Sequence, residues 1–154
     1  MKKVFIDTNV ILDFILHREH WAEAKDVVAY FVEKRTEMVM SVGGFYTMHY
    51  LIDKYLRKEL HLDTATRIVP LRTLLTRILQ TFNVAEHDNA SLLRGVVDPQ
   101  YTDLEDSCQY QLAIKSGCEL LITFDIGHFP QTGDEVLHVV TPQAFLESVN
   151  GYTF

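Results

Sequence analysis

Short apolar runs alternate with segments of helical periodicity along most of the chain, and this alternation restricts the possible fold more than any other feature. The apolar runs predict buried strands at 4–6, 38–40, 82–85, 119–123 and 137–140. Parallel strands need long crossover connections, which helices usually supply. The order therefore predicts an α/β fold, with three α/β/α layers and a twisted, mostly parallel sheet of about five strands.

Between and after the strands, apolar residues recur at spacings of three and four, as on the buried face of a helix. Thr8 and Asn9 have side chains of the kind that cap a first helix, which is predicted to extend to about His17. Pro70 predicts a kink or a break in a later helix. The predicted helical segments are 8–17, 20–34, 45–55, 63–79, a segment from about 88, 103–115 and a segment from 142.

Size and composition are those of one domain. The 154 residues, 47% hydrophobic and 23% charged, predict a single domain over residues 1–154. No apolar stretch approaches the roughly 20 residues that span a bilayer, and no signal-peptide cleavage site follows the Met-Lys-Lys start, so we expect a cytoplasmic protein. A net charge of −7 argues against a general nucleic-acid binder that neutralises phosphates with Lys and Arg. A nuclease stays open, because a bound metal reverses the charge of an acidic site locally.

Four aspartates are predicted to meet at one edge of the sheet. Asp7 directly follows the first strand, and Asp125 lies two residues past the strand 119–123. In parallel sheets, ligands collect at the carboxyl ends of the strands, where the strand order reverses. Asp103 and Asp106 lie three residues apart at the start of the preceding helix and so share one face. Carboxylates this close repel one another unless a cation neutralises them, which predicts a site for Mg²⁺ or Mn²⁺.

Each of these aspartates also has a purely structural interpretation. Asp7 alone is equally well explained as a residue that initiates a helix. Asp103 and Asp106 alone are typical first-turn acids, stabilised by the helix dipole, and Asp125 alone is typical of a loop. The joint placement of all four at one predicted edge favours the metal site.

Other polar residues give weaker signals. Asp13 lies six residues into the first helix and is expected to make structural hydrogen bonds. The seven histidines are scattered without the spacing of a zinc site. His128 and His49 remain as candidate neighbours of the acidic site.

Three segments carry a resemblance to a known family, namely "FIDTNVILDFIL", "DLEDSCQYQLAIKSGCELLIT" and "TFDIGHF". In this order and at these distances they resemble the PIN-domain family of ribonucleases, which includes the VapC toxins of bacterial toxin–antitoxin systems. The resemblance spans nearly the whole chain. It implies a twisted parallel sheet with helices on both sides and an acidic edge that holds Mg²⁺ or Mn²⁺.

The resemblance also implies roles for individual residues. Asp7, Asp106 and Asp125 match the family's acids and are expected to be catalytic and to hold the metal, with Asp103 as a further metal ligand. The residues that match the supporting polar positions around these acids are Asn9, Thr8 and Thr123.

One position departs from the family's pattern. The family usually has a glutamate in the helix after the second strand, and Thr47 occupies the matching place here. The stretch "SVGGFYTMHYLIDK" contains no acid before Asp53. The departure weakens the case for a second metal ion and leaves catalysis itself as a question.

The resemblance implies a metal-dependent endoribonuclease that hydrolyses RNA, expected to be a toxin restrained by a small antitoxin whose inserted segment fills the acidic groove. The alternative is a non-catalytic PIN module that binds RNA or protein. A phosphatase of the haloacid dehalogenase type is disfavoured, because those enzymes have Asp-x-Asp where this chain has Asn9. Apolar positions on the helices from His20 and from Tyr46 fit a homodimer interface and a buried core equally well.

Overall fold

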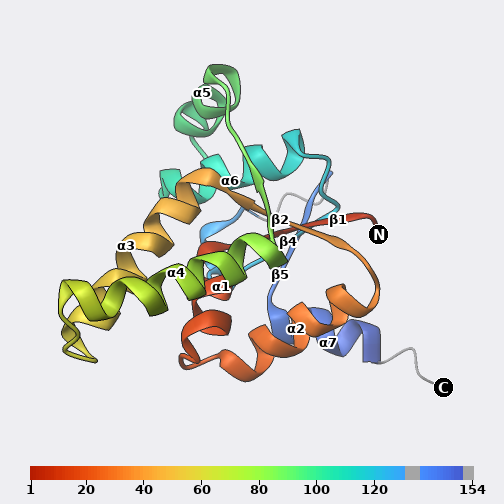
Figure 1. Ribbon diagram of the computed structural model, residues 1–154. Coiled ribbons are helices and arrows are strands. Elements are labelled where there is room, and N and C mark those ends of the chain that lie inside the picture. Colours follow the sequence, from red (N-terminus) through yellow and green to blue (C-terminus); the bar gives the residue numbers. More distant parts are fainter. Residues whose placement is uncertain (131–135, 151–154) are drawn as a thin grey trace.

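The computed structural model describes residues 1–130 and 136–150. The remaining residues, which the expected single domain also includes, lie outside the described part. The strands form one sheet in the order β3-β2-β1-β4-β5, and all neighbouring strands are parallel (Figure 1). The expected α/β fold with a parallel sheet is therefore confirmed. The strands are β1 (Lys3–Ile6), β2 (Glu37–Ser41), β3 (Asn83–Ala85), β4 (Leu120–Ile122) and β5 (His138–Val140).

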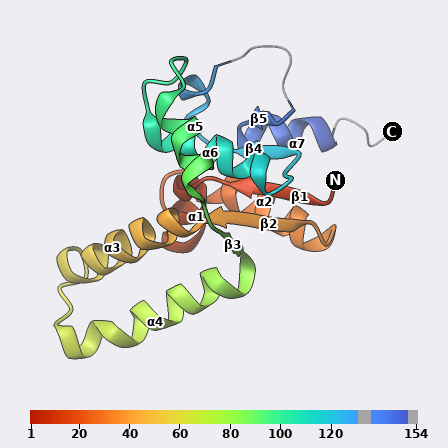
Figure 2. The same ribbon diagram turned by 90° about the horizontal axis from the view of Figure 1, so that it is seen from above.

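Helices cover both faces of the sheet (Figures 1 and 2). α1, α2, α3, α4 and α7 contribute to the core on one face, and α6, against which α5 packs, contributes to the core on the other. Their bounds are α1 (Thr8–Leu16), α2 (Trp21–Glu33), α3 (Val42–Lys58), α4 (Thr64–Thr81), α5 (Asn89–Val97), α6 (Leu104–Lys115) and α7 (Pro142–Asn150), with a short 3-10 helix η1 (Ile126–His128) after β4.

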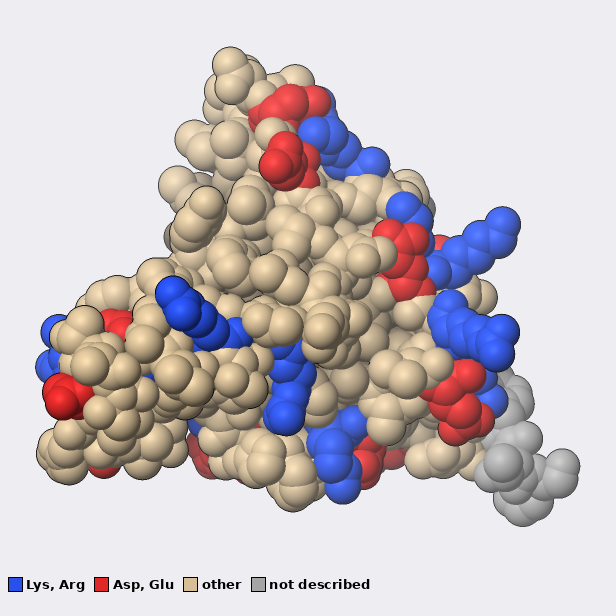
Figure 3. Space-filling model, viewed as in Figure 1, with Lys and Arg blue, Asp and Glu red and all other residues tan. Residues whose placement is uncertain are grey.

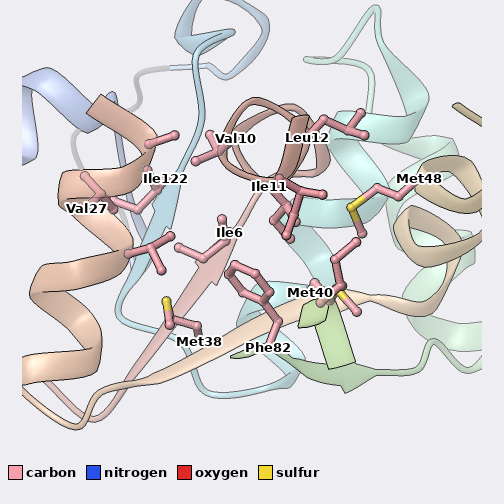
Figure 4. Close-up of a cluster of buried hydrophobic side chains, with 14 of the residues drawn as sticks. Ile6, Val10, Ile11, Leu12, Val27, Met38, Met40, Met48, Phe82 and Ile122 are labelled. Carbon is pink, nitrogen blue, oxygen red and sulfur yellow. The ribbon is translucent and has the colours of Figure 1, made fainter. Parts of the chain in front are cut away.

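The central strands β1, β2 and β4 place side chains in the cores on both faces of the sheet, because successive side chains of a strand point to opposite sides. In β1, Val4 and Ile6 belong to the core under α1, α2 and α3, whereas Phe5 belongs to the core under α6. Figure 4 shows the first of these cores, where Ile6 lies among side chains of α1, α2 and β2. Burial on both faces explains why the strands read as continuous apolar runs.

The strand order reverses between β1 and β4. From β1 the chain adds β2 and then β3 on one side, and it then returns to place β4 on the other side of β1. At such a point the connections that follow two neighbouring parallel strands typically leave the sheet in different directions, which opens a crevice at the carboxyl ends of the strands. Asp7 and Asp125 follow these two strand ends.

The structure corrects the predicted cap of the first helix and the break predicted as one outcome of Pro70. The N-cap position of α1 is Asp7, and its side chain makes no capping hydrogen bond, so neither Thr8 nor Asn9 caps the helix. Pro70 does not break α4, which is a single helix from Thr64 to Thr81. A proline fixes a helical φ and removes only one backbone hydrogen bond. The buried side chains of Leu71 and Ile78 hold the helix on the core on the C-terminal side of that gap.

The face shown in Figure 3 carries charges of both signs. Figure 3 shows acidic and basic side chains mixed in small groups across one face, separated by larger areas without charged residues. Within the described residues, no helix has the length and apolar character needed to cross a membrane.

Candidate metal centre

A polar pocket of about 250 Å³ lies at the crevice between the ends of β1 and β4. It brings together the start of α1, the middle of α3, the start of α6 and the segment after β4. Its lining residues are Asp7, Thr8, Asn9, Thr47, Leu51, Asp103, Glu105, Asp106, Gln109, Asp125 and His128. All four predicted aspartates line the pocket, as do Thr8 and Asn9.

Asp7 is the most buried of these acids, with only 3% of its surface exposed. The buried hydroxyl of Thr123 donates a hydrogen bond to Asp7 Oδ2 over 2.9 Å, so Thr123 supports the site from beneath. Burial raises the pKa of Asp7 from 3.8 to about 6, against the hydrogen bonds from Thr123 and Gln109. The negative charges of Asp106 and Asp125 raise it further.

Asp125 is tied to the same cluster by two hydrogen bonds. Its backbone N–H donates to Thr123 Oγ1 over 3.0 Å, so one hydroxyl links the two strand ends. Asn9 Nδ2, from the first turn of α1, donates to Asp125 Oδ2 over 3.1 Å. Thr123 and Asn9, for which a supporting role was predicted, therefore hydrogen-bond to the two acids.

Asp103 and Asp106 approach from the start of α6. Asp103 is the N-cap of this helix, and its Oδ1 accepts the N–H groups of Glu105 and Asp106 at 3.0 and 3.2 Å. Asp103 therefore caps α6 with one carboxylate oxygen. Its other oxygen, Oδ2, lies 3.9 Å from Nδ1 of His128, which also lines the pocket.

His128 pairs more closely with Asp106. Its Nδ1 lies 2.7 Å from Asp106 Oδ2, and this hydrogen bond is the main reason that the pKa of His128 is raised. Burial, partly offset by the bond to His128, raises the pKa of Asp106. The expectation that His128 is a neighbour of the acidic site is confirmed. His49 is exposed and does not line the pocket.

The donor set fits a hard divalent cation. Asp103, Asp106 and His128 each offer one ligand atom, and these atoms lie within 4.8 Å of one another. The carboxylates of Asp7 and Asp125 line the same pocket. Carboxylate oxygens are the ligands that Mg²⁺ and Mn²⁺ prefer. A cation would offset the burial of the negative charge, which is the main cause of the raised pKa values of Asp7 and Asp106, and the smaller repulsion from neighbouring aspartates.

No glutamate from α3 completes the pocket. Thr47 lines it at the place expected from the family's pattern, and Asp53 is instead paired with Arg67 of α4 over 2.6 Å. Glu105, which the sequence analysis did not single out, also lines the pocket and is exposed. Its position between Asp103 and Asp106 in the first turn of α6 was the available signal.

Two further residues near the pocket differ in role. Gln109 lines it although sequence reasoning assigned it no function, and its place one turn after Asp106 was the signal. Asp13 lies outside the pocket lining and is structural, as expected. It accepts the backbone N–H of His20 over 3.0 Å and pairs with Arg18 over 3.1 Å.

Comparisons with known proteins agree with this geometry. Ribonuclease VapC1 of Aquifex aeolicus (strain VF5) is 28% identical over 151 residues, which are 97% of this chain and 96% of that protein. The crystal structure of VapBC2 from Rickettsia felis bound to a DNA fragment from their promoter contains a similar chain, with a TM-score of 0.64. The match covers 90% of this chain and 98% of that one at 13% identity, and so it shows the fold alone. A family model described as PIN domain matches residues 3–127, which include all four aspartates of the pocket, and the chain therefore belongs to the PIN domain family.

Proposed function

We propose that the protein is a Mg²⁺- or Mn²⁺-dependent endoribonuclease that hydrolyses phosphodiester bonds of RNA. One observation carries the proposal: four aspartates from three separate segments line a single pocket, and the most buried of them, Asp7, has a pKa raised to about 6. Burying carboxylates together costs stability unless a cation binds between them. Membership of the PIN family and the likeness to Ribonuclease VapC1 support the choice of reaction.

The chain's own residues would hold the ion and orient the substrate. Asp7, Asp106 and Asp125 would be the principal ligands, with Asp103 Oδ2 at the rim, while Thr123 and Asn9 keep Asp7 and Asp125 in place. When bound, the ion supplies Lewis-acid chemistry, since it acidifies water and offsets the charge of a phosphodiester. His128 adds a proton-carrying group to the rim of the pocket.

RNA needs positive charge next to this acidic pocket. Leu51 lines the pocket and also a neighbouring hollow of about 240 Å³, whose rim carries Arg18, Lys54 and Lys58 together with Glu59. None of the ion pairs found in the described part of the chain involves Lys54 or Lys58. We propose that this hollow receives the RNA backbone beside the cleaved phosphodiester.

The experiment is a cleavage assay on a labelled RNA with Mn²⁺, Mg²⁺ or EDTA. The wild type should cleave only with metal, and Asp7→Asn and Asp106→Asn should lose cleavage because each removes an anionic ligand. The Asp53→Asn variant is a matched control, since Asp53 lies outside the pocket and pairs with Arg67. Undiminished cleavage by both pocket variants would refute the assignment.

A second candidate follows from Thr47, which stands where the family usually has glutamate. The chain would then be a non-catalytic PIN module that binds RNA or protein. The likeness to Ribonuclease VapC1 over 97% of this chain favours the enzyme. Calorimetry separates the two, since the module would bind no Mn²⁺ at millimolar concentration.

We also propose a small antitoxin as partner in the cytoplasm, with the chain as the toxin. The supporting comparison is the VapBC2 structure, which contains both the toxin-like chain and its partner. A basic residue of the inserted partner segment would pair with the aspartates and displace the ion. Co-purification of the chain with the product of a neighbouring short gene, and loss of Mn²⁺ binding in that complex, would test this. Size-exclusion chromatography of the chain alone would decide between the homodimer and the monomer, which the sequence left equally open.

A further inference from the structure

Gln109 is a buried polar residue that the proposed reaction does not yet use. It lies on α6, three residues after Asp106, and only 5% of its surface is exposed. Its side chain lines the acidic pocket, where hydrogen bonding from its amide lowers the pKa of Asp7 against the larger effect of burial. Its Oε1 is buried and has no hydrogen-bond partner among the residues that the structure describes.

The unpaired oxygen lowers the stability of the folded protein, so packing alone does not explain a glutamine at this position. A buried acceptor without a partner destabilises a protein, whereas an apolar side chain of similar size would not carry this cost. Each such group in a folded protein calls for an explanation. Because the amide oxygen has no partner, we attribute the presence of Gln109 in the pocket to the interaction of its NH₂ group with Asp7.

We propose that Gln109 is a positioning residue of the metal centre, which holds the Asp7 carboxylate in the orientation that binds the ion. The inference rests on the proposed metal-dependent function and adds a residue to it. Thr123 holds Asp7 Oδ2 from the end of β4, and Gln109 holds the same carboxylate from α6. The two donors come from different elements and together restrict the rotation of the carboxylate.

The lack of a glutamate at Thr47 makes this restriction important. With one ligand fewer, the ion depends more strongly on the precise placement of the remaining aspartates. Hydrogen bonds that orient a metal ligand are typically worth about 10- to 100-fold in metal affinity. We expect a loss of this size when the amide of Gln109 is removed.

The test compares Gln109→Leu with Gln111→Leu by Mn²⁺ calorimetry and by thermal melting in EDTA. Gln111 is the matched control, because it lies on the same helix, outside the pocket, and accepts a hydrogen bond from Arg94 over 3.4 Å. For Gln109→Leu we expect about 10- to 100-fold weaker Mn²⁺ binding. Its melting temperature in EDTA should stay within about 4 °C of wild type, because the lost hydrogen bond and the removed unpaired oxygen offset each other.

A merely structural role predicts the opposite pattern. The melting temperature would fall, and the folded protein would bind Mn²⁺ within about twofold of wild type, which would overturn the proposal. If Gln109→Leu does not fold, Gln109→Met decides, because it also lacks the amide donor and fills a similar volume. The folded Gln109→Met protein should bind Mn²⁺ about 10- to 100-fold more weakly than wild type. Binding within about twofold of wild type would overturn the proposal.

These results also separate the inference from the proposed function. If wild type and Gln111→Leu bind Mn²⁺ while Gln109→Leu binds it equally well, the metal centre stands and only the role of Gln109 is refuted. If wild type itself produces no heat with Mn²⁺ and gains no thermal stability, the metal centre fails, and the role of Gln109 fails with it.

Discussion

The buried carboxylate of Asp7 should destabilise the metal-free protein, and Asp7→Asn should therefore make that protein more stable while it removes the metal site. In the folded state the pKa of Asp7 is about 6, compared with an ordinary value of 3.8. The folded protein thus binds a proton at this position more tightly than the unfolded chain does. Stability is greatest when Asp7 is protonated, and it falls as the pH rises through the range from about 4 to 6.

The magnitude follows from these two pKa values. A tenfold change in proton affinity corresponds to about 1.4 kcal/mol, so the rise from 3.8 to about 6 corresponds to about 3 kcal/mol at pH 7.5. Asparagine has the shape of the protonated acid and cannot ionise, so the variant should recover most of this free energy. For a chain of this size the gain amounts to about 6–12 °C in melting temperature.

Thermal or urea unfolding at pH 4 and at pH 7.5, in EDTA and in millimolar Mn²⁺, measures the effect. In EDTA, Asp7→Asn should melt above wild type at pH 7.5, and the difference should nearly vanish at pH 4. In Mn²⁺ at pH 7.5 the difference should shrink or reverse, because binding at about 100 times Kd stabilises only the wild type, by about 2.7 kcal/mol. A variant that is less stable than wild type in EDTA at both pH values would refute the reasoning.

The remaining predictions concern RNA binding and helix packing. Lys54→Gln combined with Lys58→Gln should weaken binding of a labelled RNA and flatten its dependence on salt without changing Mn²⁺ affinity; equal salt slopes for variant and wild type would contradict the role of the hollow beside Leu51. Gly95→Ala should destabilise the protein by about 1–3 kcal/mol in urea unfolding, because a Cβ there would lie 2.9 Å from the Cα of Cys108. Gly43→Ala is its control, since the nearest atom in its surroundings lies 3.9 Å away and alanine favours the helix, so this variant should not be destabilised.

The order of strands and helices was predictable because the signals are local and strong. β1 and β4 are buried on both faces and read as apolar runs, and parallel pairing follows from the helices between them. The edge that carries Asp7 and Asp125 was also predictable, because it depends only on which residues follow the strands. Asp103 showed the limit of this reasoning, since it both caps α6 and lines the pocket.

Gln109 carried only a weak signal in the sequence, its place one turn after Asp106, because its burial depends on tertiary packing. On an amphipathic helix a glutamine is usually exposed, and only the position of α6 against the end of β1 brings this one to Asp7. Pro70 failed as a break signal for a similar reason, since the packing of Leu71 and Ile78 holds α4 in place. Glu105 was overlooked because first-turn acids of helices are common and most of them are only stabilised by the helix dipole.

The most direct test of the metal centre is anomalous diffraction from a crystal of the wild-type protein soaked in Mn²⁺. We predict a strong peak in the pocket, bonded to carboxylate oxygens of Asp7, Asp106 and Asp125, and no such peak in crystals of Asp7→Asn. An empty pocket at millimolar Mn²⁺, or a peak bound elsewhere on the surface, would contradict the account.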